Sequence, residues 1–274
     1  MPELPEVETI KNDLRPLLVG RSIVGVKVGW EGCVDRPSVQ EFCDQIAGCR
    51  IEDVRRRGKF LTLTLSGGST LLVHLRMTGQ LLVKEATDPG ETHTRLSLRL
   101  DDDRELRFVD VRKFGRLYLV ADPKEILEDL GPEPLEGNFG VEDFCTLLRN
   151  RRGMIKPLLL NQRFIAGLGN IYVDEALFQA RIHPRCKADS LTLEELTRLY
   201  HAIRQVLRQA IEDGGTSLTD YVRPDGGEGR HQERLLVFRR AEEQCPRCGA
   251  MIERIVVGGR GTFICPCCQE GPAP

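Results

Sequence analysis

Four cysteines near the end of the chain limit its possible folds more than any other feature of the sequence. Cys245 and Cys248 form one CxxC pair, and Cys265 and Cys268 form a second pair after sixteen intervening residues. This spacing predicts a structural zinc site, because each turn supplies two thiolates and two turns complete a tetrahedron. A disulfide framework is the alternative, but we find no signal peptide and the other cysteines are scattered. Cys267 is a spare thiol that we place outside the zinc shell.

The charge of the chain is balanced overall and uneven locally. A length of 274 residues suggests about two domains, and the net charge of −2 gives no global sign of a nucleic-acid partner. Locally, residues 121–145 hold eight acids and one lysine, whereas basic residues gather elsewhere and could bind phosphate. For any one patch, a solvated surface is the simpler interpretation. We find no apolar stretch of membrane-spanning length, and we expect a cytoplasmic location, with the chromosome. The basic clusters are 55–59, 112–116, 149–156 and the eight arginines between 223 and 260.

The first 120 residues predict a β-sandwich with one helix packed on it, the first part of an α+β fold. Residues 3–19 repeat apolar side chains at helical spacing, and Gly20 follows the last of them. From 22 to 120 short β segments alternate with turn signals, which indicates roughly eight strands. The clearest strands are Leu61–Leu65, Thr70–Leu75, Leu96–Leu100 and Leu117–Val120, with turns at Gly67-Gly68 and Asp101–Asp103.

The second half of the chain changes to helical periodicity. Pro- and Gly-rich residues at 121–140 predict a linker, and Thr192 with Glu195 forms a capping box at the start of an apolar helix that Gly214 ends. Residues 216–230 are polar and glycine-rich, which is typical of a mobile loop. We predict a domain at 1–121, a linker at 122–140, a helical domain at 141–235 and a zinc module at 236–270, with a disordered tail at 270–274.

The N-terminus is a candidate catalytic centre. Loss of Met1 would leave Pro2 with a free secondary amine, whose pKa of roughly 8 makes it a usable nucleophile for a Schiff base. Glu3 and Glu6 are candidate acid–base groups beside it. The simpler interpretation is a helix start, where proline and acidic residues are favourable, and these residues alone favour it.

Glycine-rich turns supply candidate phosphate contacts. Gly167–Asn170 precedes the helical run Ile171–Ala180, and a helix N-terminus presents unpaired N–H groups to an anion. Lys156 could lie near the same anion. Arg260, flanked by glycines between the two cysteine pairs, is predicted at the tip of the ribbon hairpin.

Other loops carry residues suited to a base stack. Met77, Arg112 and Phe114 fall at predicted loop tips and could insert between bases, although core packing is the simpler interpretation for Met77 and Phe114. Lys59 lies at a probable turn, where a lysine is usually solvated. The histidines His74 and His93 have no ligand spacing and indicate structural or hydrogen-bonding roles.

Together, these motifs resemble those of the bacterial formamidopyrimidine-DNA glycosylases, the Fpg or MutM family of the Fpg/Nei superfamily. The resemblance spans Pro2 to Cys268 and rests on the opening Pro-Glu-Leu-Pro-Glu-Val-Glu, Arg-Gly-Lys-Phe, Asp-Val-Arg-Lys-Phe-Gly, Gly-Leu-Gly-Asn-Ile-Tyr-Val-Asp-Glu-Ala-Leu-Phe and the four cysteines. Leu4 favours this family over the Nei-type endonucleases, which tend to have glycine there. The resemblance implies a β-sandwich, a helix–two-turns–helix domain and a zinc finger.

The resemblance also implies a repair activity and its residues. It predicts a monomeric enzyme that excises oxidised purines from damaged double-stranded DNA and cleaves the abasic strand by β,δ-elimination through an N-terminal proline Schiff base. Thr216–Arg223 would fold over the damaged base. The implied catalytic residues are Pro2, Glu3, Lys59 and Arg260, and the implied DNA contacts are Met77, His93, Arg112, Phe114, Arg152, Lys156 and Asn170.

Two alternatives remain from the sequence. A Nei-like enzyme would excise oxidised pyrimidines instead, and relative excision of 8-oxoguanine and thymine glycol separates the two. A non-catalytic DNA-binding protein would be marked by loss of Pro2 or Glu3, and both are present.

Overall fold

A computed structural model describes residues 1–271, so most of the predicted disordered tail, residues 272–274, lies outside the described residues. The chain forms two compact units, one built from Met1–Asp129 and Ile211–Gln232, the other from Leu130–Ala210 and the residues from Glu233 onward. Among residues 1–271, none of the helices combines the length and the apolar composition of a membrane span.

The predicted N-terminal helix is confirmed as α1 (Leu4–Leu18). Its apolar face is buried from Leu4 to Leu18, and Gly20 leaves the helix with a φ of +88°, a conformation that glycine adopts without strain. At the start of the helix, the Glu6 carboxylate accepts a hydrogen bond from the backbone N–H of Glu3 at 2.7 Å. This N–H has no backbone acceptor within the helix, so the side chain supplies its partner. The helix packs against β3 and β4 of the neighbouring sheet.

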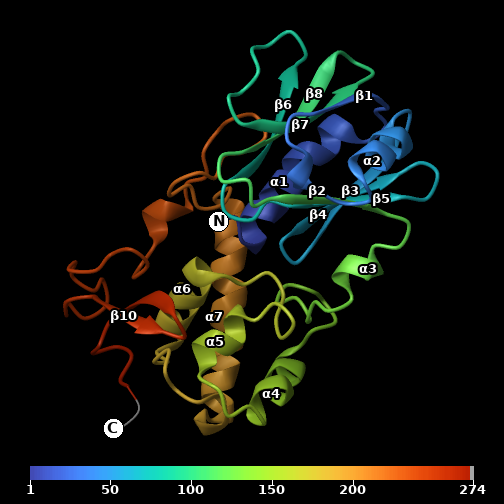
Figure 1. Ribbon diagram of the computed structural model, residues 1–274. Helices are drawn as coiled ribbons and strands as arrows, with labels where there is room; N and C mark the ends of the chain where they lie inside the picture. The colour runs from blue at the N-terminus through green and yellow to red at the C-terminus, as the bar shows by residue number, and fades with distance from the viewer. Residues whose placement is uncertain (272–274) are drawn as a thin grey trace. The chain divides into compact units, whose positions relative to one another are not determined.

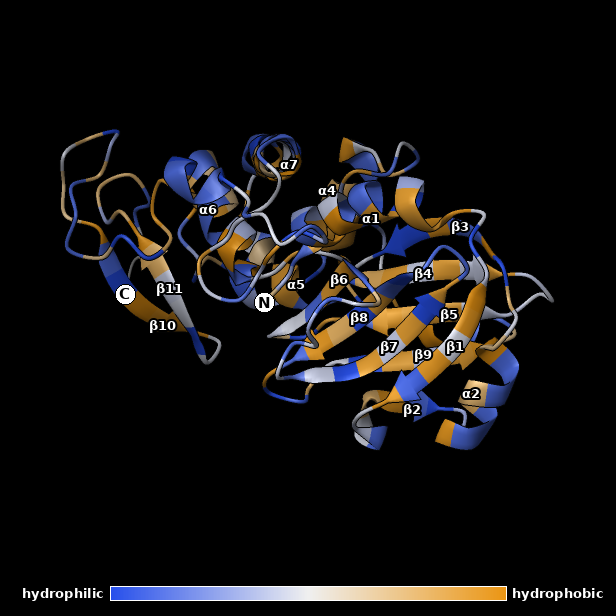
Figure 2. Ribbon diagram, turned by 90° about the horizontal axis from the view of Figure 1, so that it is seen from above, coloured by the Kyte–Doolittle hydropathy of each residue, from blue (hydrophilic) through white to orange (hydrophobic). Residues whose placement is uncertain are grey.

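Two sheets and α1 share one core in the first unit, as the sequence predicts (Figure 1). All pairings are antiparallel except β2 with β9. The strand residues in this core are mostly leucine and valine, and Figure 2 shows that hydrophobic residues predominate in the strands of both sheets. The four-stranded sheet has the strand order β1 (Ile23–Val28), β7 (Thr94–Leu100), β8 (Arg104–Asp110), β6 (Gly79–Glu85). The five-stranded sheet has the strand order β2 (Val34–Arg36), β9 (Arg116–Val120), β5 (Thr70–His74), β4 (Phe60–Leu65), β3 (Ile51–Arg57).

These nine strands slightly exceed the roughly eight that the sequence predicts, and all four of the clearest predicted strands are present. The predicted turn at Gly67-Gly68 is also found, with φ values of +83° and +86° between β4 and β5. The smaller elements of this unit are the helical turn η1 (Glu31–Cys33), α2 (Val39–Ile46) and α3 (Lys124–Leu127), the last inside the stretch predicted as a linker.

The second unit is helical, as predicted. The capping box at the start of α7 is formed: Glu195 accepts the N–H of Thr192 at 2.8 Å, and the Thr192 hydroxyl accepts the N–H of Glu195 at 3.2 Å. The apolar stripe of α7 is buried, and Gly214 follows the helix with a φ of +77°. The elements are α4 (Val141–Arg149), α5 (Ile155–Leu160), α6 (Asn170–Ala180), the short helical turn η2 (Ala188–Ser190) and α7 (Leu193–Glu212).

The predicted ribbon is present near the end of the chain. After the helical turn η3 (His231–Arg234), strands β10 (Glu253–Val257) and β11 (Arg260–Ile264) pair antiparallel. Val257 faces Arg260 across the turn, and Gly258 and Gly259 make that turn with positive φ values. Arg260 therefore begins β11 at the hairpin tip, where the sequence places it.

Candidate active site and nucleic-acid interface

The N-terminal residues are held by a buried carboxylate. Pro2, Glu3 and Glu6 are all buried, and the two oxygens of Glu6 accept different backbone N–H groups. One oxygen accepts from Glu3, and the other accepts from Thr216 at 2.8 Å, across 210 residues of sequence. The helix-start interpretation of Glu6 is thus correct, and the same side chain also ties the candidate catalytic residues to the glycine-rich loop.

That loop, predicted from composition alone, is anchored on the first unit. Tyr221 is buried in the sandwich core, and its hydroxyl donates to the Gly214 carbonyl at 3.0 Å. Burial raises the pKa of this phenol, so it stays neutral at physiological pH. Arg223 forms a bidentate ion pair with Asp13 of α1, with both distances 2.8 Å. The single aromatic residue in a polar stretch is the sequence signal that could have predicted this anchoring.

Lys59 and His74 lie at the same end of the neighbouring strands β4 and β5 in the five-stranded sheet. The register of β4 and β5 pairs Phe60 with His74, which puts the turn carrying Lys59 beside the end of β5. Lys59 is buried rather than solvated. His74 accepts the N–H of Arg76 through Nδ1 at 3.0 Å, and its ring meets Phe60 edge-on. Burial, with Arg76 and Lys59 nearby, lowers the pKa of His74 to about 3, so the imidazole is neutral beside two cations.

This depressed pKa predicts acid sensitivity of the first unit. The unfolded chain binds a proton at His74 below pH 6.5 and the folded chain does not, so stability falls as pH drops from 6.5 toward 3. Between pH 7 and pH 5 the loss from this residue is about 2 kcal/mol. Urea unfolding followed by the fluorescence of Trp30, the single tryptophan, should show that His74→Gln removes this part of the pH dependence. An unchanged difference between pH 7 and pH 5 would show that His74 titrates normally.

The structure brings together the three predicted base-stack residues. Met77 and Phe114 are 40% and 46% exposed, so the core-packing interpretation is wrong for both. The Arg112 guanidinium lies 4.8 Å from the Phe114 ring centroid, and its Nη1 lies 3.3 Å from the Met77 sulfur. An exposed cluster of one cation and two large apolar side chains suits insertion into a base stack.

A buried aspartate, to which the sequence analysis assigns no role, organises both turns of this cluster. Asp110 is fully buried; one oxygen accepts the Thr78 hydroxyl and the N–H of Arg112, and the other accepts the N–H of Gly115. The turn after β5 and the turn after β8 are therefore fixed by one carboxylate. The carbonyl of His93 accepts the N–H of Asp110, which places His93 beside the same cluster.

In the second unit, Asn170 and Arg260 meet at the ribbon hairpin. Asn170 begins α6, as predicted, and its Nδ2 donates to the Gly261 carbonyl at 2.9 Å. Its Oδ1 is buried and has no hydrogen-bond partner among residues 1–271. Arg260 next to Gly261 is exposed, and so is Arg152 in the turn between α4 and α5.

The structure corrects the position expected for Lys156. Its side chain is wholly buried, and Nζ donates to Asp174 Oδ1 at 2.6 Å, Thr262 Oγ1 at 2.7 Å and the Gly261 carbonyl at 3.3 Å. Three protein acceptors match the three N–H groups of an ammonium, so in this conformation Lys156 faces the interior and not a phosphate. The sequence could not show this, because Asp174 and Thr262 are distant along the chain.

The zinc prediction fits the structure. The four sulfurs of Cys245, Cys248, Cys265 and Cys268 lie within 4.8 Å of one another, and Cys267 is exposed and not among them. Four thiols, with no His, Asp or Glu ligand atom grouped with them among residues 1–271, match a closed structural zinc site with no position for a reacting water.

Metal analysis of two neighbouring cysteine variants should test this ligand set. Cys267→Ser should keep one zinc per chain, whereas Cys268→Ser should lose it, because three thiolates leave the tetrahedron incomplete. Inductively coupled plasma mass spectrometry on purified protein gives the stoichiometry. Zinc loss from Cys267→Ser, or full retention by Cys268→Ser, contradicts the assignment.

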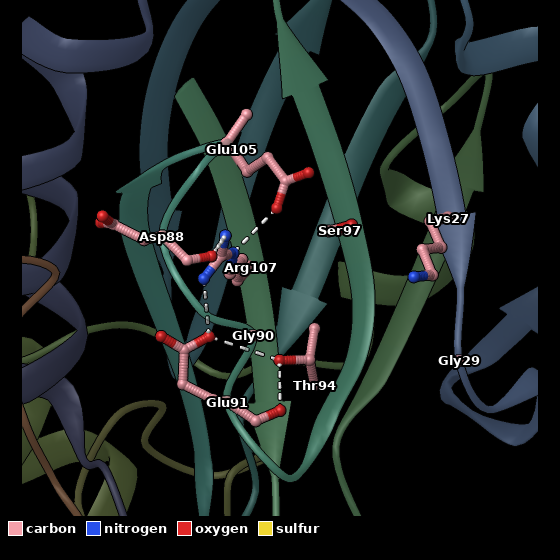
Figure 3. A pocket seen from close by; sticks show the side chains of 10 residues that line it. Lys27, Gly29, Asp88, Gly90, Glu91, Thr94, Ser97, Glu105 and Arg107 are labelled. Carbon is pink, nitrogen blue, oxygen red and sulfur yellow. Dashed lines mark hydrogen bonds and ion pairs between the residues drawn. The ribbon is translucent and has the colours of Figure 1, made fainter. Parts of the chain in front are cut away.

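A hollow of about 380 Å³ on the four-stranded sheet is not a candidate active site (Figure 3). The buried Arg107 forms part of its lining, and its guanidinium donates to Glu105, Glu91 and the carbonyls of Glu85, Asp88 and Pro89. The protein itself satisfies these donors, so Arg107 fastens the loop after β6 rather than binding a ligand.

Family models of known proteins match most of the chain. Three family models match it: the formamidopyrimidine-DNA glycosylase N-terminal domain over residues 1–117, the formamidopyrimidine-DNA glycosylase H2TH domain over 130–222, and a zinc finger found in FPG and IleRS over 242–271.

Full-length relatives and solved structures agree with these matches. The chain is 46% identical to a formamidopyrimidine-DNA glycosylase of Protochlamydia amoebophila and 48% identical to one of Herpetosiphon aurantiacus, with 98% of this chain and 100% of each relative covered. It is 36% identical to the Lactococcus lactis Fpg in complex with DNA containing an abasic site, with a TM-score of 0.92, 98% of this chain and 100% of that chain covered. A G226P mutant of the Lactococcus protein with Fapy-dG DNA gives a TM-score of 0.93 at 36% identity and the same coverage.

Proposed function

This chain belongs to the formamidopyrimidine-DNA glycosylase family, and we propose that it breaks the glycosidic bond with the secondary amine of Pro2. The chain is a base excision repair glycosylase for oxidised purines and an abasic-site lyase. The observation that carries this function is 47% identity to a relative over 98% of this chain, together with the presence of Pro2 and Glu3. Its partner is damaged double-stranded DNA, and we propose that it acts as a monomer in the cytoplasm, on the chromosome.

The proposed chemistry starts with extrusion of the damaged nucleotide, because a base inside a duplex is out of reach. The Pro2 nitrogen then forms a bond to the sugar C1′ while the bond from C1′ to the base breaks, and the base leaves with a proton. Opening of the sugar ring gives an iminium, which acidifies the C2′ protons. Loss of one of these protons expels the 3′ phosphate, and a second elimination expels the 5′ phosphate. Glu3, buried beside Pro2, moves protons in these steps.

The remaining proposed roles are contacts with DNA. We propose that Lys59, Asn170 and Arg260 bind phosphates around the extruded nucleotide. Met77, Arg112 and Phe114 fill the gap that it leaves, which offsets part of the cost of unstacking. His93 and Arg152 are further DNA contacts, and Thr216–Arg223 covers the damaged base. We assign these roles to a catalytic domain at 1–121, a linker at 122–140, a helical DNA-binding domain at 141–235 and a zinc finger at 236–270.

Two duplexes that differ only in the lesion test the proposed substrate. One carries 8-oxoguanine and the other carries thymine glycol at the same position, and borohydride is added to trap the covalent intermediate. We expect trapping and strand cleavage mainly with 8-oxoguanine. Preference for thymine glycol would instead identify a Nei-like activity, and no cross-link with either duplex would indicate a protein that binds DNA without catalysis.

A further inference from the structure

A buried ion pair in the second unit has no place in the chemistry above. Lys156 of α5 and Asp174 of α6 are both wholly inaccessible to solvent, and Nζ and Oδ1 are 2.6 Å apart. Removing two charges from water costs more than their attraction usually returns, so such a pair is weak evidence for a stabilising role. Burial raises the pKa of the Asp174 carboxyl to about 7 despite Lys156, which reflects that cost. A role other than stability therefore explains this pair better.

Three further partners of the pair lie in β11, at or close to the tip of the ribbon hairpin. Lys156 Nζ donates to the Gly261 carbonyl and to the Thr262 hydroxyl, and Asp174 Oδ2 accepts the N–H of Phe263 at 3.1 Å. The Thr262 hydroxyl in turn donates to the carbonyl of Arg260 at 3.0 Å. Three consecutive residues after Arg260 are thus bonded to one ion pair.

Asn170 makes a hydrogen bond to the same segment of the hairpin. It lies four residues before Asp174 on α6, so the two side chains share one face of the helix, and its Nδ2 donates to the Gly261 carbonyl that Lys156 also contacts. The network therefore fixes the backbone at Arg260 relative to the side chain of Asn170.

Simple attachment of the zinc module does not require this pair. The neighbouring Glu175 accepts the N–H groups of Leu236, Val237 and Phe238 at 2.8–2.9 Å and already fastens the start of that module to α6. The hairpin tip, by contrast, is glycine-rich around Arg260, and glycine leaves the backbone free to take many conformations.

We propose that Lys156 and Asp174 are positioning residues, which hold the Arg260 turn against Asn170 so that both are preorganised to bind the DNA backbone. This inference rests on the proposed function, in which Arg260 binds a phosphate. Preorganisation matters because an arginine on a flexible turn loses conformational entropy when it binds a phosphate, and this loss weakens binding.

A double-mutant cycle on DNA affinity tests the proposal. Lys156→Met with Asp174→Leu removes both charges and leaves no buried ion unpaired, and Arg260→Ala removes the phosphate ligand itself. The probe is a duplex with a tetrahydrofuran abasic analogue, and Kd is measured across a range of KCl concentrations. Arg260→Ala should bind about tenfold more weakly, as for one lost charge-assisted hydrogen bond, and its salt slope should fall by about 1.

The paired apolar variant should reproduce both changes while it keeps one zinc per chain. Adding Arg260→Ala to it should change neither Kd nor the slope further, because both routes remove the same contact. A purely structural role would lower the active fraction and leave the slope unchanged. Glu194→Gln, at the exposed Glu194–Arg198 pair on α7, is the matched control and should behave as wild type.

Thr262→Val is a milder variant in case the paired variant does not fold. It keeps the volume of a fully buried side chain and removes the hydroxyl between Lys156 and the Arg260 carbonyl, so the salt slope should again fall. Wild-type slopes in the folded variants, or additive effects with Arg260→Ala, would overturn the inference. If Arg260→Ala itself binds normally, the inference falls too. Excision of 8-oxoguanine by the wild-type protein is measured in parallel, and its absence would refute the proposed function instead.

Discussion

A protein that retains Met1, or that carries an N-terminal tag, should form no borohydride cross-link to an 8-oxoguanine duplex and should excise the base several orders of magnitude more slowly. Either extension converts the Pro2 amine into an amide nitrogen, whose lone pair is delocalised and cannot attack C1′. Removing a covalent nucleophile is among the largest single losses that an enzyme suffers. Mass spectrometry gives the fraction of chains that begin at Pro2, and trapping should scale with that fraction.

Treatment with a methionine aminopeptidase supplies the control. It should restore trapping to protein that retains Met1 and should leave tagged protein inactive. The same tag on the other terminus should have no effect on trapping. Efficient cross-linking by a homogeneous tagged protein would mean that another amine is the nucleophile.

Glu3→Gln should lose excision of 8-oxoguanine by about 10²–10⁴-fold, the usual contribution of a general acid–base group, and cleave a preformed abasic site less than about tenfold more slowly. An abasic sugar already offers an aldehyde, so Pro2 needs no help in expelling a base. The fold at this point should survive, because the bond to Glu6 comes from the backbone N–H of Glu3 and a glutamine keeps it.

Single-turnover rates on an 8-oxoguanine duplex and on an abasic-site duplex measure how much Glu3 contributes to base excision and to strand cleavage. Glu8→Gln is the matched control, since Glu8 lies on the same helix and its partly buried carboxylate pairs with Lys11 and Arg56, to which a glutamine can still accept a hydrogen bond. Equal losses on both substrates for Glu3→Gln would show that Glu3 serves every step and not base loss in particular.

Local spacing is what made much of this molecule predictable. Each of the two CxxC pairs, the repeat of apolar residues in α1 and the capping box of α7 depends on residues a few positions apart, and each was found where the sequence placed it. The same holds for β4, because the alternation of leucine and threonine along this strand reports which face is buried.

Residues whose role depends on distant partners were decided only by the tertiary structure. The sequence favoured core packing for Met77 and a phosphate contact for Lys156; the structure exposes the first and buries the second against Asp174 and Thr262. It also joins Glu6 to Thr216 across 210 residues. Composition and periodicity report how apolar a residue is and how it repeats, which determines the elements and the zinc site of this protein. Whether a charged or flexible side chain meets solvent, DNA or a buried counter-charge is determined by which elements pack around it, and that is a property of the folded chain.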